Sequence, residues 1–318
     1  MNESFPAVRR RTFLLAGAAL TVAGSGVAEP ASAGPAGGKG RPVASRSAGA
    51  FKVIPLLDAA GPFFLDRQAA FPEATPHDWD LARGIDPGAF GPGETWQLDF
   101  RCYAIRGPRG RLTLVDTGVG PDGSPAGGWA PTPGRLPSEL GHAGIDPADV
   151  DAVVLTHLHE DHFGWSVGLD GTPMFPNARY VVQRSEVAAL PDGDAALAYV
   201  VEPLRATGQL DEVDGGVRLA TAPGRSGGSI RVIPTPGHTP GHQSVVVEHG
   251  REQVIVTGDV LVHAVQLVDP GVAYRYEADP DAARRTRQRL LTEARVRRTV
   301  LATAHLRQPW TEVVPEPR

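Results

Sequence analysis

Lysine, cysteine and long hydrophobic runs are scarce in this chain of 318 residues. Lys39 and Lys52 are the only lysines, so arginine supplies 29 of the 31 basic residues, a skew that we attribute to coding bias. The single cysteine, Cys102, excludes an internal disulfide and a cysteine-rich zinc site. No run of about 18 uninterrupted apolar residues occurs, so no transmembrane helix is expected in the mature protein.

The overall composition is that of a globular protein with a substantial core, because 41% of the residues are hydrophobic and 21% are charged. The 38 glycines and 30 prolines predict many loops and turns. The formal net charge of −5 gives no electrostatic reason to bind a phosphate backbone. We therefore expect no nucleic-acid partner.

Residues 1–33 have the three parts of a secretory signal peptide. Three arginines at 9–11 precede a moderately apolar run at 13–23, and Ala-Ser-Ala at 31–33 provides a cleavage site. An arginine pair followed by Thr-Phe-Leu resembles the twin-arginine type of signal. The sequence therefore predicts export to the periplasm or the extracellular space.

Residues 34–50 are rich in glycine, alanine, proline and serine and predict a flexible leader, so we expect one folded domain over 51–318. Two groups of short β-branched runs with helical patterns between them favour an α/β domain of sheets covered by helices. Strands are expected at 52–57, 98–105, 111–115, 152–155, 179–182, 230–233, 244–247, 253–256 and 299–302. Helices are expected at 137–143, 185–189, 195–205 and 280–297.

One expected strand leads directly into a dense group of metal-ligand side chains, because residues 157–162 read His-Leu-His-Glu-Asp-His. His157 and His159 leave the strand as alternate residues, so both side chains can point the same way. A loop or helix start can then turn Asp161 and His162 toward a neighbouring point. Imidazoles with a carboxylate suit borderline divalent metals such as zinc, so this segment predicts a metal site.

Four further expected strands are followed by a histidine or an aspartate. Alone, each would be a weak signal, since a histidine after a strand is more often an ordinary loop residue. Their arrival in order around the histidine cluster makes a strong joint signal. The four residues are Asp116, His238, Asp259 and His305.

This pattern resembles the metallo-β-lactamase superfamily over nearly all of residues 51–310, and the segment at 157–162 matches the superfamily's H-x-H-x-D-H signature. The resemblance implies a four-layer αββα sandwich with a single catalytic domain and two divalent ions, expected to be zinc, at the sheet edge. Asp116 would support the histidine loop. The implied ligands are His157, His159 and His238 for one ion, Asp161, His162 and His305 for the second, and Asp259 as a bridge between them.

Residues 235–244, Thr-Pro-Gly-His-Thr-Pro-Gly-His-Gln-Ser, resemble the N-acyl-homoserine-lactone lactonases of that superfamily. This resemblance implies hydrolysis of a lactone or another small ester by a hydroxide shared between the two ions, with Asp161 orienting it and moving its proton. Some lactonases have a tyrosine three residues after the bridging aspartate. This chain has Val262 there and His263 next, which weakens the substrate assignment more than the hydrolase assignment.

Four other functions are known or conceivable for the same arrangement of ligands. A phosphotriester hydrolase would use the same two ions. A β-lactamase is disfavoured because Asp259 fits a bridging carboxylate that the superfamily's true β-lactamases lack. A mononuclear iron dioxygenase would leave part of the ligand set unused, and a non-catalytic binding protein should have lost ligands. The sequence leaves a homodimer open.

Several residues have no assigned role in the sequence. His242 and His263 are expected either to support the metal site or to contact substrate, or else to be ordinary loop histidines. The arginine-rich segment 281–298 predicts a solvated helix with Leu290 and Leu291 toward the core. A pocket for an acyl or aryl group is expected among the aromatic residues Phe63, Phe64, Phe71, Trp79, Phe90, Trp129 and Trp165.

Overall fold

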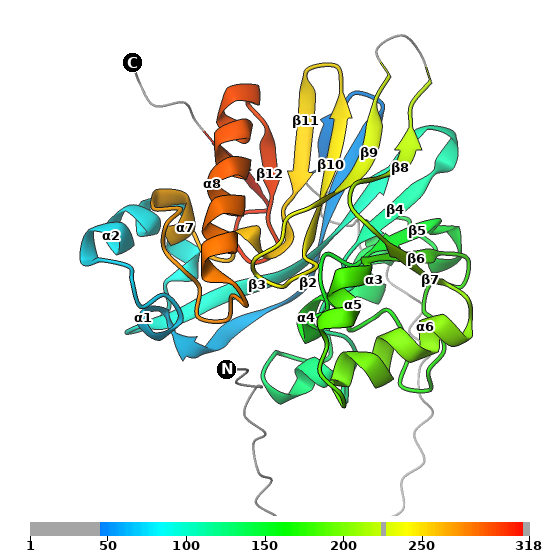
Figure 1. Cartoon of the computed structure of the whole chain (residues 1–318), viewed down its shortest axis with the longest axis horizontal. Coiled ribbons are helices and arrows are strands. Elements are labelled where there is room, and N and C mark those ends of the chain that lie inside the picture. Colours follow the sequence, from blue (N-terminus) through cyan, green and yellow to red (C-terminus); the bar gives the residue numbers. More distant parts are fainter. Residues whose placement is uncertain (1–44, 224–226, 314–318) are drawn as a thin grey trace, which may run out of the picture. The chain divides into compact units, whose positions relative to one another are not determined.

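Two mixed β-sheets pack face to face in the computed structural model, which describes residues 45–223 and 227–313 (Figure 1). The predicted signal peptide at 1–33 and the leader up to residue 44 lie outside the described residues, so export remains a prediction. The description below concerns the compact unit that spans Val43–Arg318.

The first sheet contains seven strands of the described part of the chain, in sequence order from β1 to β7. The pairs from β1 to β4 are antiparallel, and those from β4 to β7 are parallel. The strands are β1 (Arg46–Ala48), β2 (Phe51–Asp66), β3 (Thr95–Arg106), β4 (Leu112–Val115), β5 (Ala152–Val154), β6 (Arg179–Gln183) and β7 (Leu210–Val213).

The second sheet has six strands within the described residues, in the order β13-β12-β11-β10-β9-β8. Only the pair of β11 and β12 is parallel. The strands are β8 (Val217–Thr221), β9 (Ser229–Pro234), β10 (Gln243–His249), β11 (Glu252–Val256), β12 (Val300–Ala302) and β13 (Trp310–Glu312).

Alternating side chains of the central strands supply two different cores. In β3, Tyr103 and Ile105 pack between the two sheets, whereas Cys102 points to the outer face of the first sheet. In β10, Val245 lies between the sheets and Val246 lies on the outer face of the second sheet. Because side chains alternate along a strand, nearly continuous apolar runs are needed here, and both faces of each sheet are buried.

Helices cover both outer faces and complete four layers. The first sheet is covered by α3 (Leu136–His142), α5 (Arg184–Ala189) and α6 (Glu202–Ala206), and the second by α8 (Pro280–Arg297). This arrangement confirms the predicted αββα sandwich. Shorter helices are α1 (Arg67–Ala70), α2 (Pro76–Ile85), α4 (Glu160–Phe163) and α7 (Val265–Val268). The remaining helical turns are η1 (Pro87–Ala89), η2 (Pro108–Gly110), η3 (Pro125–Gly128), η4 (Pro147–Asp149), η5 (Leu197–Val201) and η6 (Gly258–Val260).

The predicted boundary between leader and domain at residue 50 is wrong. Arg46–Ala48 forms β1 and pairs with the start of β2, and Ala48 is fully buried. The sequence Arg-Ser-Ala has no apolar alternation, so its strand forms only because the neighbouring edge of β2 offers backbone partners.

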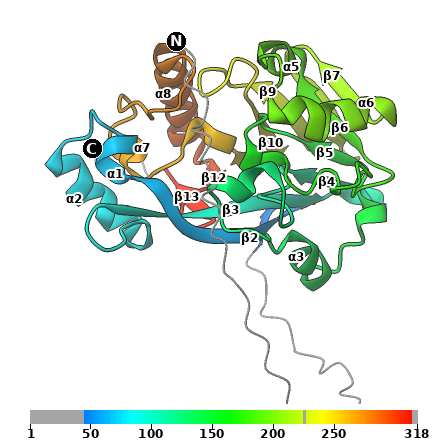
Figure 2. The same cartoon turned by 90° about the horizontal axis from the view of Figure 1, so that it is seen from below.

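The long strands β2 and β3 continue beyond the sandwich toward α1 and α2 (Figure 2). Phe63 and Phe64 lie beyond the strand expected at 52–57, in this extended part of β2. Helix α2 has a capping box between Thr75 and Asp78 with Pro76 at its first turn. The extension carries an aromatic cluster of its own, separate from the core between the sheets.

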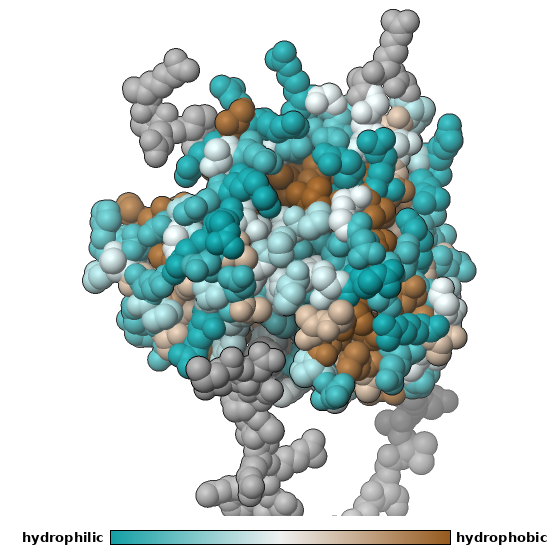
Figure 3. All heavy atoms as spheres, in the orientation of Figure 1, coloured by the Kyte–Doolittle hydropathy of each residue, from teal (hydrophilic) through white to brown (hydrophobic). Residues whose placement is uncertain are grey.

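The face of the molecule shown in Figure 3 is mainly hydrophilic. On this face, apolar residues form separate patches among hydrophilic ones. None of the described helices combines the length and the apolar character that crossing a membrane requires. The large hydrophobic side chains that are most exposed are Phe64, Leu81, Ile85, Leu169 and Val296.

Candidate metal centre

All seven predicted ligands gather at one edge of the sandwich, where strands of both sheets end. The parallel strands β4 and β5 end at the same edge of the first sheet, and β11 and β12 do so in the second. The loops after β5, β9, β11 and β12 therefore meet there. They carry His157, His159, Asp161, His162, His238, Asp259 and His305, which form three overlapping groups able to hold a metal ion.

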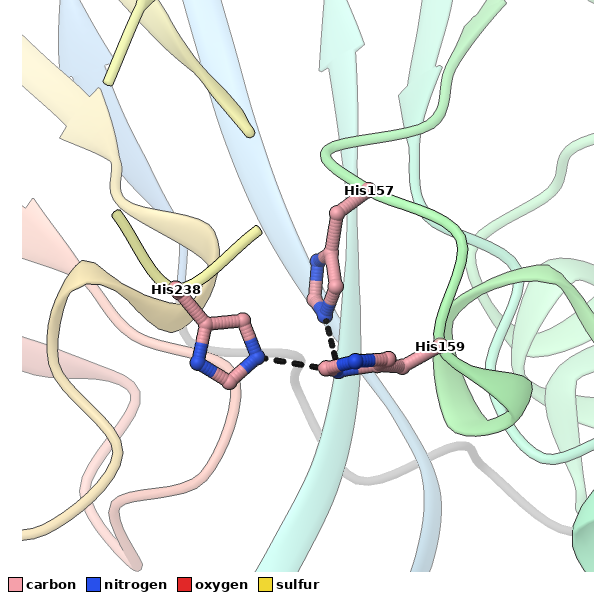
Figure 4. Close-up of side chains that lie close together, drawn as sticks. All are labelled: His157, His159 and His238. Atoms are coloured by element: carbon pink, nitrogen blue, oxygen red, sulfur yellow. Dashed lines mark hydrogen bonds between the residues drawn. The ribbon is translucent and has the colours of Figure 1, made fainter. Parts of the chain in front are cut away.

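His157, His159 and His238 turn their rings toward one another, although His238 comes from the other sheet (Figure 4). Nδ1 of His159 lies 3.0 Å from Nε2 of His157 and 2.9 Å from Nε2 of His238. Zinc–nitrogen bonds of about 2.0 Å in a tetrahedral site place nitrogens roughly 3.3 Å apart. The three nitrogens thus converge as ligands of one ion do.

Asp161, His162 and His305 form a second group beside the first. Oδ2 of Asp161 lies 3.5 Å from Nε2 of His162 and 3.5 Å from Nε2 of His305. All three side chains are buried. This group brings together the start of α4 and the loop after β12, which are 143 residues apart in sequence (305 − 162).

The carboxylate of Asp259 lies between the two groups. Its Oδ2 is 3.3 Å from Nε2 of His238 and 3.9 Å from Nε2 of His157. Its Oδ1 is 3.4 Å from Nε2 of His162 and 3.2 Å from Nε2 of His305. Each oxygen therefore faces a different group, which is the arrangement of a carboxylate that bridges two ions.

Outer hydrogen bonds fix the orientation of the histidine rings. Nδ1 of His162 donates to Oδ2 of Asp116 at 2.9 Å, and Nδ1 of His305 donates to the carbonyl of Asp99 at 2.8 Å. Asp116 also accepts the backbone N–H of Thr156 at 2.7 Å. With Nδ1 occupied, Nε2 of each ring is directed inward, as is usual for metal-binding histidines. Asp116 thus has the supporting contacts that the sequence predicted.

His242 contacts the backbone of Asp259. Its Nε2 accepts the backbone N–H of Asp259 at 2.9 Å, and its Nδ1 lies 2.8 Å from Oγ1 of Thr235. Burial lowers the pKa of His242 to about 3, so the ring is neutral. Gly258 has a φ of 52°, and a Cβ there would lie 2.6 Å from Nε2 of His242, so only glycine fits this close approach. His242 therefore positions Asp259.

His263 is part of the aromatic core and lies away from the predicted ligands. Four aromatic rings surround it with centroid distances of 5.3 to 5.6 Å, those of Phe71, Trp79, Phe90 and Trp96. Its Nδ1 accepts the N–H of Val265 at 3.0 Å, and burial lowers its pKa to about 3. Only 1% of the residue is exposed, so this histidine packs within the aromatic core.

Electrostatics inside the centre favour an anionic Asp259 among imidazoles. Burial opposes ionisation, but His305, His162 and His238 together hold the pKa of Asp259 well below its ordinary value. Burial, with the neighbouring His162 and His159, lowers the pKa of His157 well below its ordinary value. His157 is therefore neutral, which is the protonation state that binds metal.

The residues present fit a pair of divalent metal ions. Five imidazoles and two carboxylates converge, a donor set that zinc accepts. Over residues 45–223 and 227–313, Nε2 of His162 and Oδ1 of Asp259 are buried without a hydrogen-bond partner, although they lie 3.4 Å apart. Buried polar atoms without partners are rare and call for a ligand. The role of the seven side chains as ligands stays a prediction.

Tyr274 is a candidate functional residue that the sequence analysis missed. Its ring stacks on that of His238, with centroids 5.9 Å apart and planes 11° apart. Burial and the nearby carboxylates of Asp259 and Asp161 raise its pKa well above the ordinary value, so the phenol keeps its proton. No motif marks it, because it lies 15 residues after Asp259 (274 − 259) and reaches the centre through folding alone.

An aromatic belt, defined as Phe63, Phe64, Trp129, Tyr274 and Tyr276, lies beside the centre. Ring centroids of contacting pairs within it are 4.2 to 6.4 Å apart. One end is Tyr274 on His238, and the other reaches His305 through Phe100, whose ring is 5.8 Å from both Trp129 and His305. The belt thus connects ligands of both groups.

The aromatic residues from which a pocket was predicted separate into two sets and one single residue, and the pocket itself stays a prediction. Phe63, Phe64 and Trp129 belong to the aromatic belt, whereas Phe71, Trp79 and Phe90 pack around His263. Trp165 instead donates its Nε1–H to Oδ1 of Asp58 at 3.0 Å. Sequence position could not separate these sets, because the chain folds back on itself between β2 and β3.

The predicted solvated helix at 281–298 contains one fully buried arginine. Arg287 donates to the carboxylate of Glu277 at 2.7 Å and to the carbonyls of Val260 and Val272 at 3.2 and 3.0 Å. Leu290 and Leu291 do face the core, as predicted. Arg287 was mispredicted because it satisfies the loop backbone between Asp259 and Tyr274, a long-range need that helix periodicity does not reveal.

Comparison with known proteins agrees with this geometry. Residues 101–305 match the model of the metallo-β-lactamase superfamily. The chain belongs to this superfamily. Mouse metallo-β-lactamase domain-containing protein 1 is 33% identical to it over 225 residues, which are 70% of this chain and 68% of the mouse protein. Membership supports the prediction of a metal-dependent hydrolase.

Bacterial lactonases are also similar to this member of the superfamily. N-acyl homoserine lactonase AttM of Rhizobium radiobacter is 34% identical over 173 residues, and the match spans 52% of this chain and 62% of the lactonase. Among solved structures, the hydrolase AbOPH has a TM-score of 0.68 at 24% identity and covers 87% of this chain and 98% of its own. The dizinc quorum-quenching lactonase AidC has a TM-score of 0.65 at 16% identity, with coverages of 87% and 98%. These two structures confirm the fold.

Asp259→Ala should reduce the metal bound by zinc-loaded protein from two ions per chain to one or none, because both groups lose their shared carboxylate. His157→Ala should remove mainly the ion of the three-histidine group. Both are measured as zinc per chain by mass spectrometry after gel filtration. The control is His142→Ala on the exposed face of α3. Two retained ions in Asp259→Ala would contradict a bridging role.

Proposed function

We propose that this protein is a hydrolase that uses two divalent ions, expected to be zinc, to open a lactone or cleave another small ester. The observation that carries the proposal is the position of Asp259, whose two carboxylate oxygens face two different groups of ligands. A mononuclear iron dioxygenase would need one group only. The complete set of converging side chains also disfavours a non-catalytic binding protein.

The ions, when bound, would supply a hydroxide at neutral pH and polarise the substrate carbonyl. The chain's own residues would then direct the reaction. Asp161, whose Oδ2 lies within the centre at 3.5 Å from Nε2 of both His162 and His305, would accept the proton of the attacking water and return it to the leaving alcohol. Cys102 lies fully buried in the outer core of the first sheet, so it cannot act as a nucleophile.

The hydroxyl of Tyr274 would donate a hydrogen bond to the substrate. The tyrosine ring stacks on that of His238 and packs against Phe71, with the centroids of Tyr274 and Phe71 5.3 Å apart, and 8% of the residue is exposed. A phenol held in its protonated form can donate a hydrogen bond to a developing alkoxide. The tyrosine of some lactonases that is absent at Val262 would thus have a counterpart from another segment.

The aromatic belt supports a substrate with an apolar substituent. Phe64 is 41% exposed, and Trp129 and Tyr276 are half-buried, so apolar surface is accessible next to the centre. Trp129 is held by its Nε1–H, which donates to Oε2 of Glu160 at 2.7 Å beside the predicted ligand Asp161. An acyl chain or aryl group that buries this surface would gain about 25 cal/mol per Å². The similarity to proteins named lactonases favours an acyl lactone.

We also propose that the protein acts outside the cytoplasm. This proposal rests on the twin-arginine-type sequence at residues 1–33 alone.

A pH-stat assay with a long-chain acyl-homoserine lactone tests the proposed function. Purified, zinc-loaded mature protein should release acid from the lactone, and a chelator should abolish the release because both ligand groups lose their ions. The control is re-addition of zinc, which should restore the rate. Protein that holds two ions and releases no acid from the lactone would contradict the lactone assignment, and a phosphotriester would then be the next substrate class to assay.

Tyr274→Phe should lower kcat for the same lactone about 100-fold, because it removes one hydrogen-bond donor to the developing alkoxide. KM and the number of bound ions should stay unchanged, since the ring still stacks on His238. The matched control is Tyr180→Phe, which removes a buried hydroxyl from the outer core. An unchanged kcat in Tyr274→Phe would exclude this residue from the reaction.

A further inference from the structure

Glu186 lies outside the predicted ligand set, yet its carboxylate contacts both segments that carry the three-histidine group. It is located on α5 and only 3% of it is exposed. Oε1 accepts the backbone N–H of Leu158 at 2.9 Å, and Leu158 lies between His157 and His159. Oε2 accepts the backbone N–H of Gly241 at 2.9 Å, three residues after His238.

These two hydrogen bonds join loops of different sheets. Leu158 follows β5 of the seven-stranded sheet, and Gly241 lies in the loop between β9 and β10 of the six-stranded sheet. A Cβ at Gly241 would lie 2.2 Å from the backbone nitrogen of Glu186, so the loop of His238 packs directly against α5. This buried carboxylate therefore joins the two loops, together with the backbone N–H of Gln243, which donates to the carbonyl of Thr156 at 2.8 Å.

The second ligand group has different supports. His162 is held by Asp116, and His305 is held by the carbonyl of Asp99. Among the described residues, the Glu186 carboxylate accepts its backbone hydrogen bonds from Leu158 and Gly241 and makes none to His162 or His305. The contacts of Glu186 are thus specific to one half of the centre.

We propose that Glu186 is a positioning residue for the three-histidine group. By holding His157 and His159 at a fixed distance from His238, it sets the affinity of that half of the centre for a divalent ion, and the other half is independent of it. Supporting residues behind metal ligands typically contribute 10- to 100-fold in metal affinity. The inference rests on the dinuclear centre of the proposed function, but not on its substrate.

Glu186→Gln is the most informative variant. Glutamine keeps the size of the side chain but offers one acceptor and one NH2 group, which would face a backbone N–H at about 2.9 Å. One of the two loops must then move away. Glu186→Asp keeps both acceptors and shortens the side chain by one methylene, so its effect should be smaller, and it replaces Glu186→Gln if that variant does not fold.

The effect on zinc affinity is measured without any substrate, by calorimetric titration of zinc in the presence of a competing chelator. In a His305→Ala background, which retains the three-histidine group, Glu186→Gln should weaken zinc binding about 10- to 100-fold. In a His159→Ala background, which retains the other group, it should change zinc affinity less than about 3-fold. Circular dichroism confirms that each variant is folded.

Asp58→Asn is the matched control for a purely structural effect. Asp58 is also a buried carboxylate that accepts two loop N–H groups, those of Val119 and Leu136 at 2.7 and 2.6 Å, but neither residue adjoins a predicted ligand. It should lower Tm as Glu186→Gln does and leave zinc affinity unchanged in both backgrounds.

Equal losses in both backgrounds, or unchanged affinity in the His305→Ala background, would overturn the proposal for Glu186. Wild-type protein that binds fewer than two ions would overturn it together with the dinuclear centre. Wild-type protein that binds two ions but hydrolyses no ester would contradict only the proposed function, because the affinity measurements are made without substrate.

Discussion

Burial of the Asp259 carboxylate is the constraint around which the two sheets are arranged. An ionised carboxylate in a protein interior is costly unless opposite charge or strong donors surround it. Here the imidazoles of two groups provide that environment, and bound cations would complete it. Its backbone N–H donates to His242, which holds the backbone from which the side chain projects between the two groups.

Strand direction explains how ligands so distant in sequence meet. Parallel pairs in each sheet bring successive strand ends to one edge, and the two inner faces bury valines and isoleucines that keep those edges aligned. The loops at this edge carry the chemistry, and buried side chains behind them connect one loop to the next. Asp116, His242 and Glu186 each hold backbone that adjoins a predicted ligand.

The strand pattern was sufficient to predict sheets covered by helices and to select the seven candidate ligands, because each of these lies within a few residues of an apolar strand. The four-layer sandwich and the division of the ligands between two ions were implied by the resemblance to the superfamily. The sequence did not reveal Tyr274, Glu186 or the buried role of Arg287, since these depend on contacts between segments far apart in the chain. The strand at Arg46–Ala48 has no apolar alternation and was missed for that reason. Helix α2 was also missed, although the capping box of Thr75 and Asp78 at its start is a local pattern of the kind that predicts a helix.

Anomalous X-ray diffraction from zinc-loaded crystals, collected on both sides of the zinc absorption edge, tests the dinuclear centre most directly. The account predicts two peaks about 3.5–4 Å apart, one among His157, His159 and His238 and the other beside His162 and His305, with Asp259 between them. A single peak, or two peaks with Asp259 bound to only one of them, would contradict it.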